Sequence, residues 1–156
     1  MSTDVSAERI RAWIDDDLVE AVDAYPDPAA EINLTVEMSN LVIHVIRRDP
    51  DGPILVGQEI EYDDEIRERI QSMEGGDRDE MVARIRETMT EVPVIYGFRN
   101  PQGENVVFRE MSNIFIESRI YPDELSQDAL MTRLVDVWKA MRYLDDIVTL
   151  MNAVER

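Results

Sequence analysis

Four arginines are the side chains best suited to bind an anion. Arg47 and Arg48 end one expected strand, and Arg99 and Arg109 lie on or beside two further expected strands. A guanidinium presents a planar fork of donors that matches the oxygens of a carboxylate or a phosphate. If these arginines surround a pocket, the chain is a small-anion-binding sensor, or an enzyme that uses strand arginines and carboxylates.

His44 is the only histidine, and it lies within the apolar run 41–46. A catalytic or metal-binding histidine needs a nucleophile or a second ligand nearby, and no Ser, Cys or other His adjoins it in the sequence. We therefore interpret His44 as a structural residue. The alternation of a strand places it on the face opposite Ile43 and Val45, near Arg48.

Known catalytic and metal-binding motifs are missing from the sequence. The lack of Cys excludes disulfides, zinc–thiolate sites and thiol nucleophiles. The G-x-S-x-G turn, the H-E-x-x-H pair and the glycine fingerprint for dinucleotides do not occur. The run Asp15-Asp16-Asp17 falls on an expected helix, where successive side chains diverge by about 100° and cannot meet at one ion. We expect no catalytic residue, no cofactor and no metal.

The charge of the chain indicates its habitat. Asp and Glu number 34 against 16 Lys and Arg, a formal net charge of −18 over 156 residues, and Lys139 is the one lysine. Dispersed acidity with almost no lysine is typical of halophilic archaeal proteins, because concentrated salt screens the repulsion. An acidic face for basic partners and a divalent-cation site are the alternative interpretations. Binding to nucleic acid is not expected, since phosphates would be repelled.

The composition predicts one cytoplasmic domain over residues 1–156. Hydrophobic residues make up 44% of the chain, which is enough for a core. No apolar run reaches the length of about 18 residues that suggests a membrane helix. The polar, acidic start of the chain does not match a secretory signal. We expect no contact with a membrane.

Hydrophobic periodicity predicts the α+β class, with an antiparallel sheet of about five strands covered on one face by helices. The expected order is an N-terminal helix, a three-stranded meander, two short central helices, two or three strands and a long C-terminal helix. The expected helices are 7–24, 63–73, 77–90 and a long one capped by Ser126. The expected strands are 31–38, 41–48, 53–61, 94–98 and 106–108, with 114–120 as a further strand or a bent continuation.

Two of the expected strands carry apolar residues on both faces. Val42 and Ile46 alternate with Ile43 and Val45, and the run Ile54-Leu55-Val56 is apolar throughout. One layer of helices covers only one face of a sheet, so a second apolar face needs a partner. The candidate interface residues are Val42, His44, Ile46, Ile54 and Val56.

Four stretches carry a family resemblance: Ile10-Arg-Ala-Trp-Ile, Glu31-Ile-Asn-Leu-Thr-Val, Leu41-Val-Ile-His-Val, and Ile120-Tyr-Pro-Asp-Glu-Leu-Ser before the long helix. With the order of elements, they resemble an uncharacterised archaeal protein family that has the type III secretion chaperone-like fold. The resemblance spans about residues 6–152 and implies a dimerising α+β sandwich without known catalytic residues. We expect a non-enzymatic, chaperone-like or regulatory module that forms a homodimer or binds a protein client.

Overall fold

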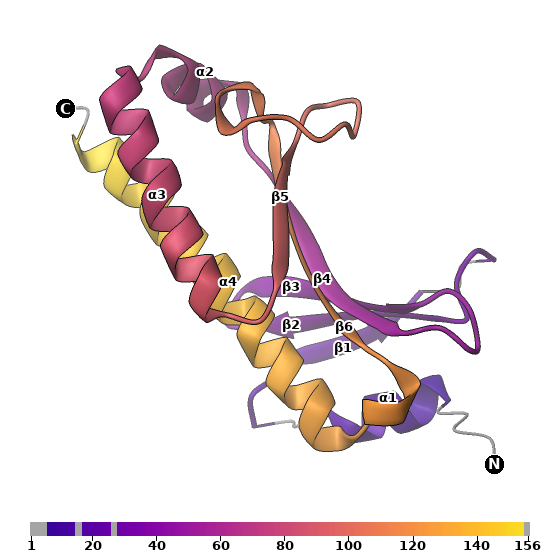
Figure 1. Ribbon diagram of the computed structural model, residues 1–156. Helices are drawn as coiled ribbons and strands as arrows, with labels where there is room; N and C mark the ends of the chain where they lie inside the picture. Colours follow the sequence, from indigo (N-terminus) through magenta and orange to yellow (C-terminus); the bar gives the residue numbers. More distant parts are fainter. Residues whose placement is uncertain (1–5, 15–16, 26–27, 155–156) are drawn as a thin grey trace.

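The computed structural model describes residues 6–14, 17–25 and 28–154, with side chains described as far as residue 146. Figure 1 shows a bent sheet with helices along one side. The elements in chain order are α1 (Ala7–Trp13), β1 (Ala21–Ala24), β2 (Ile32–Met38), β3 (Leu41–Arg47), β4 (Ile54–Glu61), α2 (Asp64–Ser72), α3 (Gly75–Glu91), β5 (Ile95–Arg99), the 3-10 turn η1 (Phe108–Glu110), β6 (Asn113–Ile120), the 3-10 turn η2 (Pro122–Glu124) and α4 (Gln127–Val154).

The six strands form one antiparallel sheet in the order β1-β2-β3-β4-β6-β5. The expected α+β class and the antiparallel sheet are confirmed. Ser39 and Asn40 join β2 to β3 with φ angles of 47° and 67°. Positive φ at both residues of a two-residue loop is the geometry that matches the twist of a hairpin. This turn sets the register that places Thr35 opposite His44.

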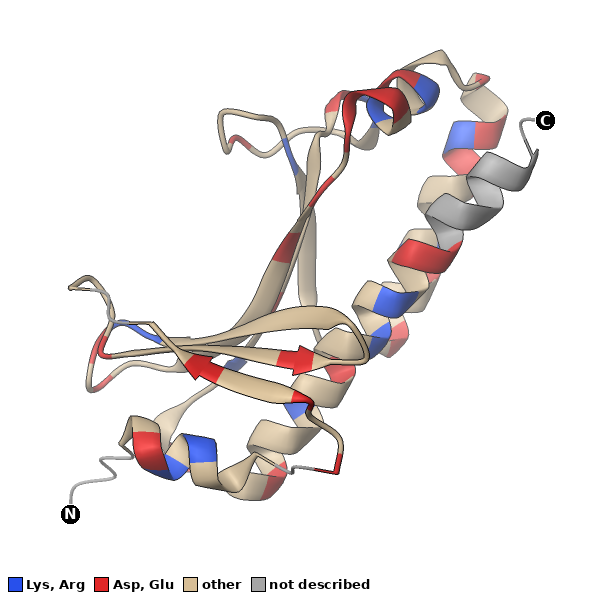
Figure 2. Ribbon diagram, turned by 180° about the vertical axis from the view of Figure 1, so that it is seen from behind, with Lys and Arg blue, Asp and Glu red and all other residues tan. Residues whose placement is uncertain are grey.

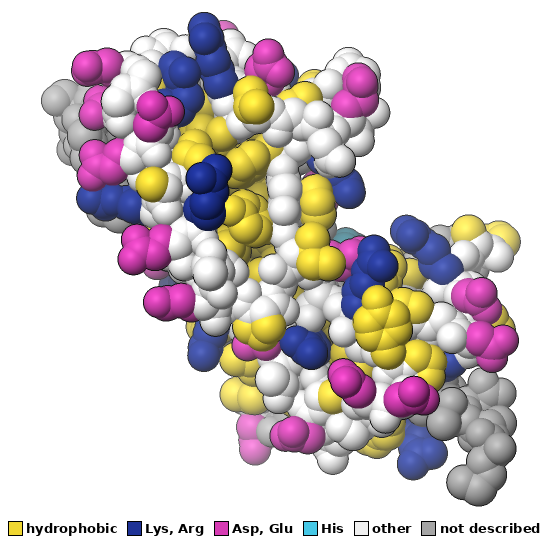
Figure 3. Space-filling model, viewed as in Figure 1, with side chains coloured by type: hydrophobic (Ala, Val, Ile, Leu, Met, Phe, Trp, Pro, Cys, Tyr) yellow, Lys and Arg dark blue, Asp and Glu magenta, His cyan; other side chains and the backbone are white. Residues whose placement is uncertain are grey.

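One face of the sheet forms the core together with the helices. In β2 the buried residues are Ile32, Leu34, Val36 and Met38, which alternate with half-buried polar residues. Helix α4 packs across β6, β4 and β3 with Leu130, Leu134 and Val137 buried, and α1 packs against α4 and β2. In Figure 3, apolar side chains also gather in the space between α3 and β5. Tyr96 and Phe98 of β5 are only partly buried.

The N-terminal helix is shorter than the apolar spacing predicts. It ends at Trp13 rather than at Ala24, and 21–24 form strand β1 instead. The helix prediction for 21–24 was wrong because these residues gain a ladder of hydrogen bonds along the free edge of β2, a tertiary contact that local periodicity does not register. Asp15 and Asp16 lie outside the described residues.

The central helices follow the prediction in part. Asp63 caps α2 through a hydrogen bond from the Ile66 amide to its Oδ1, at 3.0 Å. The expected start of the next helix at Asp77 was wrong, because α3 begins at Gly75. Arg78 donates hydrogen bonds back to the carbonyl oxygens of Ile70 and Met73, and these bonds hold the junction between the two helices closed.

The expected return strand at 106–108 is also replaced. Asn105 makes one bridge to Arg99, and Phe108 then turns into the core at the start of η1. Strand β5 pairs instead with β6, which runs the full length of β4 as well. The buried contact of the Phe108 ring with Phe98, at 5.3 Å between centroids, favours the turn over a longer hairpin.

Candidate functional site

The candidate site lies on the face of the sheet that is turned away from the helices, here called the open face. Figures 1 and 2 show α1, α3 and α4 on the other side of the sheet, and no described helix packs over this face. The two halves of the sheet bend toward each other on the open side, which leaves a notch at the right of Figure 3. The open face is therefore concave.

Strand register places specific residues beside one another on the open face. His44 is opposite Gly57 of β4, and Gly57 is opposite Glu117 of β6. One step along the strands, Ile46 is opposite Leu55. On the other side, Glu59 is opposite Phe115. Because Gly57 has no side chain, the surface of the open face is depressed at this position, between the side chains of the neighbouring residues.

A hollow of about 280 Å³, here called the central hollow, opens over Gly57. Its walls come from four neighbouring strands and from the residue after β3. The lining residues are His44, Ile46, Arg48, Leu55, Gly57, Gln58, Glu59, Arg99, Phe115, Ile116 and Glu117.

Two glycines determine the shape of this surface. A Cβ atom on Gly57 would lie 2.3 Å from the carbonyl oxygen of Ile116, so the approach of β6 requires glycine. A Cβ atom on Gly97 would lie 2.5 Å from Cε1 of Phe115, so the Phe115 ring lies directly against the backbone of β5. The guanidinium of Arg99 then covers this ring, 3.9 Å from its centroid.

The acidic residues that line the central hollow are already paired. Arg99 lies 3.7 Å from Glu59, and the Arg119 Nε donates to Glu117 at 3.0 Å. The hydrogen bond from Arg119 to Glu117, together with the charge of that carboxylate, raises the pKa of Arg119. Arg48 is exposed and makes no ion pair with any residue that the structure describes. Among the charged residues that line the central hollow, the one without an ion pair to a described residue is therefore Arg48.

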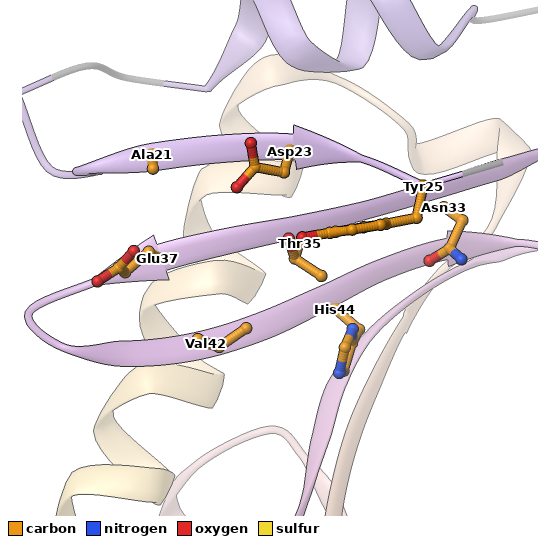
Figure 4. Close-up of a pocket in the computed structure, with 8 residues that line it drawn as sticks. All are labelled: Ala21, Asp23, Tyr25, Asn33, Thr35, Glu37, Val42 and His44. Atoms are coloured by element: carbon orange, nitrogen blue, oxygen red, sulfur yellow. The ribbon is translucent and has the colours of Figure 1, made fainter.

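A second hollow of about 480 Å³ adjoins the first and shares His44 with it. Figure 4 shows its lining side chains over β1, β2 and β3. The ring of Tyr25 lies along β2 with its hydroxyl end toward Thr35, and His44 projects from β3. The two hollows form one continuous surface across the open face, with His44 at their border.

The candidate interface residues are divided between the two faces. Val42, His44 and Ile46 lie on the open face. Ile54 and Val56 are 1% and 0% exposed and belong to the core, which corrects their expected place beside the other three. The run 54–56 is apolar at every position, so alternation alone does not tell which residues face the helices. Leu55, which is paired with Ile46, is the open-face residue.

The four candidate anion-binding arginines do not meet at one place. Arg48 and Arg99 both line the central hollow. Arg47 is 2% exposed on the other face, where it donates to the carbonyl oxygens of Asp49 and Pro50 and lies 4.0 Å from Glu31. Arg109 is exposed in η1 and does not line the hollow. Adjacent strand residues point to opposite faces, which separates Arg47 from Arg48.

Sequence reasoning missed the other residues of the central hollow, above all Leu55, Glu59, Phe115 and Glu117. The one signal for them was Gly57, an isolated glycine within a strand pattern, which often marks a close approach of another backbone. Among the described residues no group of three His, Cys, Asp or Glu could hold a metal ion. Within the same part of the chain, no helix has the length and apolar character needed to cross a membrane.

Comparison with known proteins places the chain in a family. Residues 6–148 match the model of a family described as "uncharacterized conserved protein (DUF2299)". The chain belongs to this family. The match spans the sheet and most of α4, so both hollows lie within the family region. A comparison with curated proteins finds no match.

A solved structure shows the same fold. It is the crystal structure of an uncharacterized protein from Methanothermobacter thermautotrophicus, with a TM-score of 0.73 and 21% sequence identity. The match covers 93% of this chain and 97% of that protein. At this level of identity the likeness shows that the two proteins share a fold, and the structural neighbour is an archaeal protein.

Proposed function

We propose that this member of the family is a non-enzymatic, cytoplasmic protein-binding module of a salt-adapted organism, and that its open face binds a second copy of the chain. The observation that carries the proposal is a sheet face without a helix that exposes apolar side chains. Val42 and Ile95 on this face are 40% and 53% exposed, and Ile46 and Leu55 are partly buried beside them. Apolar surface of this kind favours contact with a partner.

The size of the open face supports a dimer. Six strands at a spacing of about 4.8 Å and a length of about 26 Å for the eight residues of β4 give a face of roughly 600 Å² in projection. A stable interface buries about 800 Å² on each partner. The face supplies most of that area, and loops at its rim would supply the rest.

The charge balance of the central hollow favours a second copy of the chain over a strongly charged client. The central hollow is lined by two arginines and two glutamates, although the whole chain carries a net charge of −18. In a two-fold dimer the same patch meets itself, so a balanced patch avoids the repulsion that an acidic patch would create. Arg48 and Arg99 of one copy can approach Glu59 or Glu117 of the other.

Light scattering in about 2 M KCl, a concentration that screens the remaining acidic surface, tests this proposal. We expect a particle of twice the 18.0 kDa chain mass. Val42→Asp places a charge on the open face and should give monomers. Val107→Asp is the matched control, because Val107 is 64% exposed and lines neither hollow. A monomeric native protein, or equal effects of the two variants, would contradict the proposal.

A second function is supported by one observation, that Arg48 and Arg99 line the same hollow. We propose as the alternative that the central hollow binds a small anion, as in a sensor or an enzyme. Thermal stability measured with increasing sodium phosphate, at constant ionic strength, tests it. Phosphate should raise the melting temperature of the native protein and have a smaller effect on Arg48→Gln.

A further inference from the structure

We infer that the central hollow takes a small organic carboxylate, whose charged end contacts Arg48 and His44 and whose apolar part contacts Ile46 and Leu55. This inference rests on the anion-binding function proposed as the alternative, and it names the class of ligand.

The charge of the ligand follows from the ion pairs at the hollow. Glu59 is paired with Arg99, and Glu117 is paired with Arg119. Arg48 is the guanidinium at the hollow for which the described residues provide no acidic partner. One unpaired cation suits a ligand with a single negative charge, because Glu59 and Glu117 are already paired with Arg99 and Arg119.

The position of His44 adds a polar contact on the same side. His44 lines the hollow from β3, four residues before Arg48 on the open face. Its imidazole carries a hydrogen-bond donor in either protonation state. A carboxylate has two oxygens, and it can accept from the Arg48 guanidinium and from the imidazole together.

The walls of the hollow explain why the ligand should also have an apolar part. Ile46 and Leu55 form a cross-strand pair beside Gly57 and are not completely buried. The Phe115 ring is less available, because it lies against Gly97 and is covered by Arg99. The apolar part of the ligand therefore contacts the aliphatic side chains of Ile46 and Leu55, which lie next to His44 in the hollow.

The size of the hollow limits the ligand. Drug-sized ligands occupy pockets of about 300–1,000 Å³. The central hollow, at about 280 Å³, lies just below this range and is open to solvent on one side. A compound with one ring or a short aliphatic chain fits such a volume.

The single histidine provides a direct test. The imidazole proton signals in an NMR spectrum come from His44 alone, since the chain has one histidine. The titration uses sodium benzoate, the neutral analogue benzamide, and sodium phosphate, each at constant total ionic strength. It is repeated on Ile95→Asn, a neutral change on the open face outside both hollows, so that self-association through this face does not hide the hollow.

The variants separate a site from a general effect of charge. Arg48→Gln removes the unpaired guanidinium, and Arg48→Lys keeps the charge without the planar fork. Arg86→Gln is the matched control, because Arg86 is exposed on α3 and does not line the hollow. Circular dichroism shows that each variant has folded before it is titrated.

We expect a saturable shift of the His44 signals with benzoate, weakened by about tenfold or more in Arg48→Gln and unchanged in Arg86→Gln. An equal response to benzamide, or no loss of affinity in Arg48→Gln, would overturn the inference. Phosphate binding that depends on Arg48, with no tighter binding of benzoate, would overturn the ligand class but leave the anion-binding function. No response to either anion would overturn both.

Discussion

The approach of β6 to Gly57 of β4 allows a quantitative test of how these two strands fit together. In Gly57→Ala the new Cβ atom would lie 2.3 Å from the Ile116 carbonyl oxygen and 3.2 Å from Cα of Glu117. Both are backbone atoms of β6, so no side-chain rotation relieves the overlap. Strand β6 must move by roughly 1 Å to restore ordinary contact.

The cost of that movement can be worked out from the pairing. The β4–β6 pair runs from Ile54 opposite Ile120 to Glu61 opposite Asn113, with Gly57 near its middle. Weakening two ladder hydrogen bonds costs about 2 kcal/mol, and overpacking adds about 1–3 kcal/mol. We expect Gly57→Ala to lower the free energy of unfolding by about 3–5 kcal/mol, which is a large part of the 5–15 kcal/mol typical of a domain.

Two other glycines calibrate the measurement. In Gly97→Ala the new Cβ meets the Phe115 ring, which is a side chain and can turn away at the cost of its contact with Arg99. We expect a loss of about 1–2 kcal/mol there. Gly76 lies in the first turn of α3 with open space around it, so Gly76→Ala should stabilise the protein by about 0.5–1 kcal/mol.

Urea unfolding in high KCl, followed by circular dichroism, measures all three variants under conditions that screen the surface charge. The expected order of stability is Gly76→Ala, native protein, Gly97→Ala, Gly57→Ala. A loss below about 1 kcal/mol in Gly57→Ala, or one smaller than in Gly97→Ala, would show that β6 does not press against Gly57 as described.

Two further predictions concern charge. Salt should weaken the repulsion between carboxylates within the acidic clusters at 59–65, 77–80 and 145–146. The melting temperature should therefore rise between about 0.1 M and 2 M KCl. Equal melting temperatures at both concentrations would contradict a salt-adapted surface. Burial, and secondarily the charge of Asp145, raises the pKa of Tyr62. The folded state then holds this proton more tightly than the unfolded state, so stability should fall as pH rises above the ordinary tyrosine pKa of about 10. Urea midpoints at pH 9 and pH 11 should differ less in Tyr62→Phe than in the native protein, whereas the exposed control Tyr121→Phe should behave as the native protein does.

Where local chemistry decides an element, its position could be predicted. The turn between the expected strands 31–38 and 41–48 and the cap Ser126 lie where the sequence places them. Each depends on the backbone conformation or the side-chain oxygen of one or two residues. These features need no contact with residues far away in the sequence, and for that reason they can be predicted from the sequence alone.

Elements that depend on distant contacts could not be predicted in the same way. Residues 21–24 have the apolar spacing of a helix and form β1, because the edge of β2 offers hydrogen bonds. Phe108 has the spacing of a strand and enters the core beside Phe98. In both cases the deciding contact is made with a residue more than eight positions away in the sequence. The hydrophobic periodicity of a short segment gives no information about such a contact.

The candidate site shows the same division. The sequence by itself determined the acidic charge, the α+β class, the hairpins that join β2, β3 and β4, and a strand that carries His44 between apolar neighbours, since these follow from composition and local periodicity. Only the tertiary structure decided that Leu55 rather than Ile54 and Val56 lies on the open face, and that Arg48 and Arg99 line one hollow. Register between strands is set by the packing of one whole face against the helices, so residues from four strands acquire a common surface only when the sheet is complete.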